Sequence, residues 1–163
     1  MKRFVFAAAA MAIAAPGFAK DNLGVFDSWG AFRDPGAGRC YAIAVPQAGS
    51  AVRDYEPFAT VGTWPRRDVR GQFHVRLSRT LSKAPRISLA IGGQRFALTG
   101  GGGDAWATDK AMDAAIVAAM RSAGSMSVSA TDARGRRFTD RYALAGAATA
   151  LDAASLGCAG MRR

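Results

Sequence analysis

Histidine is almost missing from this chain of 163 residues, which contains a single one, His74. Any Ser–His or Cys–His mechanism would therefore have to use that residue. The G-x-S-x-G, S-x-x-K and H-E-x-x-H motifs of common hydrolases are missing as well. Two distant cysteines and one histidine supply too few ligands for a zinc site. We therefore expect no catalytic residue, no metal and no cofactor.

Long hydrophobic runs are also missing, because no stretch reaches the 18 or more apolar residues of a transmembrane helix. The apolar run from Phe4 to Ala15 carries no charge, follows two basic residues and precedes the small residues of Gly17-Phe18-Ala19. This order is typical of a cleavable secretory signal. We predict a signal peptide over residues 1–19 and a periplasmic or secreted domain over residues 20–163 that does not span a membrane.

Cysteine is scarce, with only Cys40 and Cys158 present. Exported proteins fold in an oxidising compartment, where an even number of cysteines favours a disulfide. Such a bond would tie an early strand to the C-terminal tail. The alternative is a pair of free, buried thiols.

Alternation of apolar and polar residues predicts a β-rich domain. The expected strands cover residues 25–32, 40–45, 58–64, 72–78, 86–91, 94–98, 126–130 and 137–144. The strongest hairpin signal is Gly92-Gly93, since two glycines accept the positive φ angles of a type I′ turn. The run Gly100–Gly103 reads as a mobile loop, because no G-K-[ST] follows as in a phosphate-binding loop.

One helix is predicted over about residues 109–123, where Met112, Ile116 and Met120 form an apolar stripe. Asp109 and Asp113 lie on one face at the start of the helix, where their negative charges interact favourably with the helix dipole. The same spacing would also suit a catalytic carboxylate pair. A short C-terminal helix is expected over 147–154. The fold class is mainly β: a single-domain β-sandwich or closed β-sheet with one packed helix.

Acidic residues are few, with 12 Asp and Glu against 22 Lys and Arg, for a net charge of +10. Loss of residues 1–19 removes two basic residues and leaves +8. The candidate anion-binding residues are Arg66, Arg67, Arg70, Arg76, Arg79, Arg134, Arg136 and Arg137. Alternation predicts that Arg70, His74 and Arg76 share a strand face. The alternative is a solvated basic surface without a ligand.

The partners expected for these arginines are anionic lipids or glycans of the cell envelope, or an envelope protein. Nucleic acid is not expected, because aromatic residues are not interleaved with the arginines as in a single-strand channel. Trp106 is expected to anchor the core rather than to stack on a ligand. His74 is expected on the polar, exposed face of its strand.

Several segments together resemble the invasion-associated locus B family of exported proteobacterial proteins. They are Trp29-Gly-Ala-Phe, Arg39-Cys40-Tyr41 with Gln47, the segment Asp113–Arg121, and Tyr142–Gly146 followed by 147–151. The resemblance implies a small exported β-rich protein with no known catalytic residues. The family's near-neighbour disulfides cannot form, because Arg33 replaces one of its cysteines and 101–107 contains none. Cys158 is then the partner left for Cys40.

The sequence thus predicts a non-catalytic exported protein that binds anionic envelope components through arginines. Two other functions stay open at this point. One is a periplasmic enzyme inhibitor that presents the loop from Gln47 to Glu56. The other is a hydrolase that depends on His74.

Overall fold

The computed structural model describes residues 19–49 and 52–162, so that residues 1–18 of the predicted signal peptide lie outside the described residues. The fold is mainly β, as predicted. Its elements are β1 (Asp21–Phe26), β2 (Trp29–Asp34), β3 (Arg39–Ala44), β4 (Phe58–Trp64), η1 (Pro65–Arg67), β5 (Val69–Arg76), β6 (Ile87–Ile91), β7 (Gln94–Gly101), β8 (Asp104–Trp106), α1 (Lys110–Ser122), β9 (Ser125–Thr131), β10 (Arg137–Ala143), α2 (Ala147–Gly157) and η2 (Ala159–Arg162).

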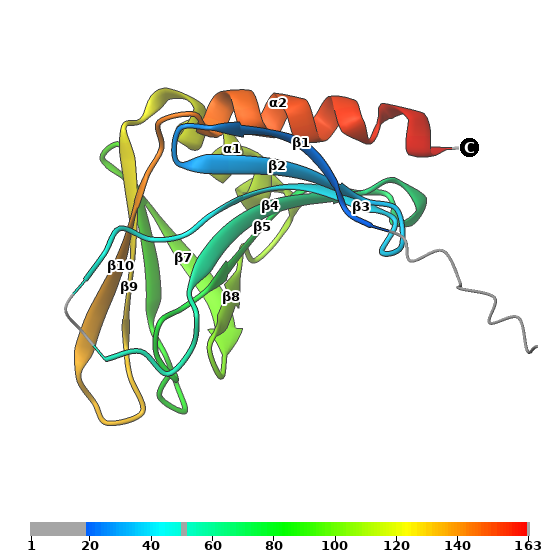
Figure 1. The fold of residues 1–163 in the computed structure, drawn as a ribbon. Coiled ribbons are helices and arrows are strands. Elements are labelled where there is room, and N and C mark those ends of the chain that lie inside the picture. Colours follow the sequence, from blue (N-terminus) through cyan, green and yellow to red (C-terminus); the bar gives the residue numbers. More distant parts are fainter. Residues whose placement is uncertain (1–18, 50–51, 163) are drawn as a thin grey trace, which may run out of the picture.

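All ten strands of the described chain belong to one antiparallel sheet in the order β1-β2-β3-β4-β5-β8-β7-β6-β9-β10. Strand β7 joins two halves of this sheet, one formed by β1 to β5 with β8 and the other by β6, β9 and β10. Residues 94–98 of β7 pair with β6, and residues 99–101 pair with β8. The sheet is curved but not closed, and its edges are β1 and β10. Figure 1 shows both helices on the same side of the sheet, with β9 and β10 extending away from them.

A single hydrophobic core lies between the two halves of the sheet and the helices. Its largest fully buried side chains include Trp29, Phe73 and Tyr142, which come from three different strands. The indole Nε1 of Trp29 donates a hydrogen bond of 2.9 Å to the carbonyl oxygen of Ala143. This bond holds the start of β2 against the end of β10, so the two edge regions of the sheet lie close together.

Helix α1 begins where the sequence predicts, because the Asp109 carboxylate accepts a hydrogen bond of 2.8 Å from the Met112 amide. Asp113 interacts with the helix dipole as expected and also contacts the sheet. Its carboxylate is buried and accepts a hydrogen bond of 2.8 Å from the Phe73 amide in β5. Burial raises the pKa of this carboxyl group. Asp113 therefore ties α1 to the sheet.

The predicted disulfide is present between Cys40 in β3 and Cys158 at the end of α2, with Cα atoms 5.7 Å apart. The Met161 sulfur packs against both cysteine sulfurs, at 3.6 and 3.7 Å. Helix α2 lies across β1, β2 and β3. The bond therefore fixes the C-terminal end of this helix to the strands that it covers.

Two sequence predictions about the sheet are wrong. The expected strand over 25–32 is a hairpin, in which β1 and β2 meet at a turn where Asp27 has a φ of 48°. The expected mobile loop Gly100–Gly103 is instead the end of β7 and a tight turn into β8. A Cβ atom at Gly100 would overlap the backbone of Asp104. Glycine there lets the two strands approach closely.

Candidate anion-binding site

His74 is part of a packed cluster on the sheet face opposite Phe73. Its Nε2 atom lies 3.0 Å from Asp104 Oδ1, and its ring stacks on Trp106 at a centroid distance of 4.9 Å. The Arg76 guanidinium donates to the other oxygen of Asp104 at 2.7 Å. The side chain of His74 is 22% exposed, so it is only partly covered. This cluster connects β5 to β8 and uses the charge of Arg76 within the fold.

Trp106 does not anchor the core. It is 36% exposed and covers the His74 ring from the outside of the sheet. The prediction of a core anchor is therefore wrong. Strand β8 has only three residues, and its buried member is Ala105, which points to the opposite face.

Arg70 does not share a face with His74 and Arg76 as the alternation predicts. The pairing of β4 with β5 shifts between Gly62 and Trp64, and Gly71 has a φ of 64°. This irregularity adds a residue to β5 and reverses the faces of the residues before it. Arg70 consequently lies beside the helices, while His74 and Arg76 lie on the other face of the sheet.

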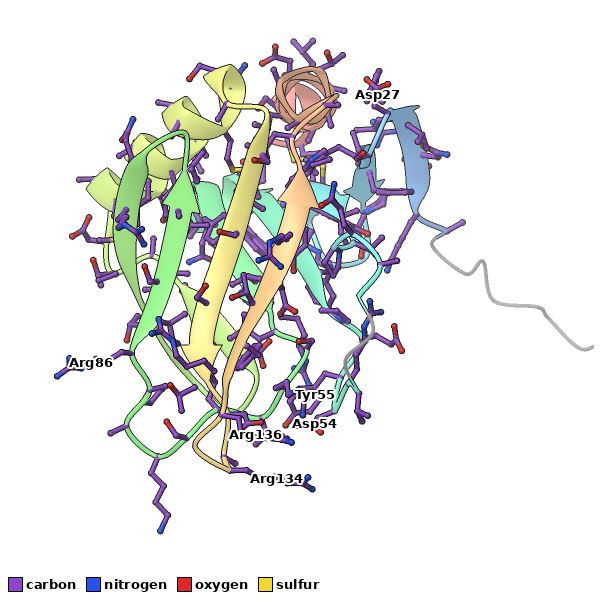
Figure 2. All side chains as sticks on the ribbon, turned by 90° about the vertical axis from the view of Figure 1, so that its left-hand side faces the viewer. Asp27, Asp54, Tyr55, Arg86, Arg134 and Arg136 are labelled. Carbon is purple, nitrogen blue, oxygen red and sulfur yellow. A yellow bond between two sulfur atoms is a disulfide. The ribbon has the colours of Figure 1, made fainter. Side chains whose placement is uncertain are left out.

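The eight predicted anion-binding arginines separate into distant groups. Arg66 and Arg67 are exposed in η1, which contacts η2 near the C-terminus. Arg79, Arg134, Arg136 and Arg137 gather instead around the β9–β10 turn. Figure 2 shows Arg134 and Arg136 close to Asp54 and Tyr55, at the end of the molecule away from the helices. Three members of this second group, Arg79, Arg136 and Arg137, line one cavity.

That cavity, about 300 Å³ in volume, lies beside the free edge of β10. We call it the arginine groove and define it by its five arginines, Arg53, Arg79, Arg136, Arg137 and Arg141. Its other wall is the segment 46–49, where the Gln47 amide donates a hydrogen bond of 2.7 Å to the Arg141 carbonyl oxygen. The groove is therefore built from three segments that are far apart in the sequence.

Asp132 fixes two of the five arginines. Its side chain is only 4% exposed, and Oδ1 accepts hydrogen bonds of 2.9 Å from the amides of Arg134 and Arg136. Its Oδ2 atom accepts from the Arg136 guanidinium at 2.9 Å and lies 3.6 Å from that of Arg79. These hydrogen bonds, the Arg136 amide foremost, lower the pKa of Asp132. Asp132 thus stays charged and orients both guanidinium groups.

The other acidic residue of the groove, Asp140, also accepts a hydrogen bond from the backbone. It is 7% exposed and accepts a hydrogen bond of 2.8 Å from the Ser78 amide. Among the described residues, no carboxylate lies within 4 Å of the guanidinium groups of Arg53, Arg137 and Arg141. The groove therefore has an excess of positive charge, and three of its five arginines are available to an anion.

Sequence reasoning missed Arg53. It stands between Val52 and Asp54 in the loop that follows β3, outside both of the arginine-rich stretches. The loop returns to the groove because the amides of Asp54 and Tyr55 donate to the Ser78 carbonyl oxygen at 2.8 and 3.4 Å. The Asp54 carboxylate in turn accepts from the Thr80 amide at 2.8 Å, which lowers its pKa. Part of the loop proposed to inhibit an enzyme is therefore anchored.

Comparison of the chain with protein-family models, with curated proteins and with solved structures found no match. In residues 19–49 and 52–162, no helix has the length and apolar character needed to cross a bilayer.

Proposed function

We propose that this chain is an exported, non-catalytic protein that binds an anionic envelope lipid or glycan in the arginine groove. The carrying observation is that Arg53, Arg137 and Arg141 all line one cavity and have no acidic partner in the described structure. Guanidinium groups match phosphate and carboxylate groups, because their parallel N–H bonds can meet two oxygens at once. A relationship to the invasion-associated locus B family remains part of this proposal.

Preorganisation favours binding over simple solvation of these charges. Arg79 and Arg136 are already oriented by the buried Asp132, so an anion does not have to order them. The two acids of the groove accept backbone hydrogen bonds and do not occupy the free guanidinium groups. The ligand expected from this arrangement is a phosphate or a carboxylate displayed on a larger envelope molecule.

Export is supported by two independent features. The basic and apolar pattern of residues 1–19 is typical of a signal peptide, and the Cys40–Cys158 bond is compatible with an oxidising compartment. In that compartment the accessible polyanions are lipid phosphates and acidic glycans rather than nucleic acid. Both features are compatible with a site that meets the envelope.

The experiment uses the chain from Lys20 onward with its disulfide intact. Sedimentation with vesicles of phosphatidylglycerol and phosphatidylcholine measures lipid binding, and titration with polygalacturonate measures glycan binding. We expect binding to one of them at 50 mM salt and a loss at 500 mM, because salt screens exposed charges. Binding that is unchanged by salt, or equal binding to pure phosphatidylcholine, contradicts the proposal.

A matched pair of variants separates a local site from net charge. The first replaces Arg53, Arg137 and Arg141 with Gln, which leaves the two arginines that hold Asp132. The second replaces the exposed Arg66, Arg67 and Arg95, so it loses the same charge elsewhere. Each arginine near an anionic surface contributes about 1 kcal/mol, so the first variant should bind about a hundredfold more weakly at low salt. The proposal fails if both variants lose the same affinity.

A further inference from the structure

A second cavity, larger than the arginine groove, opens between α1 and α2 above β4 and β5. Its volume is about 530 Å³. Its apolar lining includes Val61, Val117, Leu151 and Ala154. We call it the interhelix cleft and define it by these four residues together with the basic residues Arg70 and Lys110, which also line it. It lies on the helix side of the sheet, whereas the groove lies beside β10.

The cleft exists because small residues line the space between the helices. Ala114 on α1 and Ala154 on α2 both border it, and Gly71 stands where β5 passes below. A Cβ atom at Gly71 would only just reach Val117, at 3.9 Å. The helices are joined by an ion pair of 2.7 Å between Arg121 and Asp152. The cleft is therefore bounded mainly by α1, α2, β4 and β5.

Basic and apolar side chains line the cleft together. Of the basic ones, Arg121 is paired with Asp152. The carboxylate nearest to Arg70 is that of Asp68, at 3.8 Å, with both side chains more than half exposed. In the described structure, no carboxylate comes within 4 Å of the Lys110 amine. A ligand that matches both features has an apolar body and a single anionic head. Clefts of this size, about 300–1,000 Å³, are usual for small-molecule ligands.

We propose that the interhelix cleft binds a free fatty acid. The alkyl chain lies against Val61, Val117 and Leu151, and the carboxylate faces Arg70 and Lys110. Burial of the chain supplies most of the affinity, and the two cations fix its direction. This inference goes beyond the proposed function and does not depend on it, because the two sites share no residue.

Calorimetric titration of the disulfide-bonded chain tests the apolar part of the inference. The probes are octanoate, decanoate and dodecanoate, each below its micelle concentration. Each added methylene should tighten binding about fourfold, because a buried methylene contributes a nearly constant increment. An affinity that does not change with chain length overturns the inference.

1-Octanol tests the requirement for charge, since it has the same chain length as octanoate without the carboxylate. We expect it to bind about tenfold more weakly, because hydrogen bonds to charged groups are stronger than neutral ones. The double variant Arg70→Gln and Lys110→Gln should remove this difference and bind the two probes alike. Equal binding of octanol and octanoate to the unchanged protein contradicts the inference.

Filling the cleft gives a steric test with a matched control. Ala114→Leu places a larger side chain in the cleft, whereas Ala115→Leu changes an exposed position of the same helix that does not line it. Leucine is a good helix former, so both variants should keep the fold, which circular dichroism verifies. We expect at least a tenfold loss of dodecanoate affinity for Ala114→Leu alone. Equal affinities of the two variants would show that the cleft is not the site.

Discussion

Removal of the disulfide should cost a large part of the stability of this domain. The bond joins residues separated by 118 positions, so it restricts most of the unfolded chain. In the chain-entropy treatment, a loop of this length corresponds to about 16 cal/mol/K, or about 5 kcal/mol at 25 °C. For a domain of this size that loss lowers the melting temperature by roughly 10–20 °C. The double variant Cys40→Ala and Cys158→Ala should therefore unfold at much lower urea concentration.

The assay is urea unfolding followed by tryptophan fluorescence, on the oxidised protein, the reduced protein and the double variant. Trp29 is fully buried in the core and reports loss of tertiary packing. Reduction should destabilise the native protein as much as the substitutions do, and the double variant should not respond to reductant. The dependence on urea should also steepen after reduction, because the unfolded chain becomes more expanded. A loss below about 1 kcal/mol would refute the reasoning.

Three further predictions concern single residues. Asp132→Asn should lower the urea midpoint at pH 7, and this loss should shrink as the pH falls below about 4. The pKa of the Asp132 carboxyl is lowered in the fold, so its charge stabilises the fold above the unfolded pKa near 4 and loses that effect on acidification. Asp113→Asn should raise the urea midpoint at pH 7, because the raised pKa of Asp113 means that its buried charge opposes folding. The amide oxygen of Asn can still accept the hydrogen bond from the Phe73 amide. The gain in stability should shrink as the pH falls to about 4, where the carboxyl group of the native protein becomes neutral. Gly146→Ala should cost more than about 2 kcal/mol in urea unfolding, because its φ is 81° and a Cβ atom would overlap the backbone oxygen at the end of β1. Gly135→Ala, with a φ of 77° and open space around it, should cost only about 1 kcal/mol.

Local sequence patterns were sufficient to predict much of the fold. The strand over 58–64, the Gly92-Gly93 hairpin and the helix capped by Asp109 follow from alternation, turn chemistry and capping, and the structure contains all three. The disulfide followed from the even count of cysteines in a chain that the sequence predicts to be exported. These predictions succeed because each depends on residues close in sequence or on a single remaining partner.

The turn at Asp27 could not be predicted in the same way. Its residues Asp27 and Ser28 are common in turns, but no glycine follows Asp27 as in the usual Asp-Gly hairpin, so the two strands read as one. The face of Arg70 was predicted wrongly because β5 contains one additional residue near Gly71, which reverses the alternation of faces before it. In both cases the backbone departs from regular geometry at a position that sequence periodicity does not mark.

The arginine groove shows a different limit. Arg137 and Arg141 lie on one predicted strand, but Arg53 reaches them only because the loop after β3 is held by Ser78 and Thr80. No local pattern indicates that contact. Likewise, Arg76 looks available in the sequence and is occupied by Asp104, which a distant strand brings beside it. Tertiary pairing therefore decides which arginines are available to an anion.

The most direct measurement of the central proposal is nuclear magnetic resonance of arginine side chains during titration with inorganic phosphate at 50 mM salt. The Nε–Hε signals report binding at each guanidinium separately. The proposal predicts the largest and saturable shifts at Arg53, Arg137 and Arg141, with little change at Arg66 and Arg67. Equal shifts of all exposed arginines, or the largest shifts at Arg66 and Arg67, would contradict it.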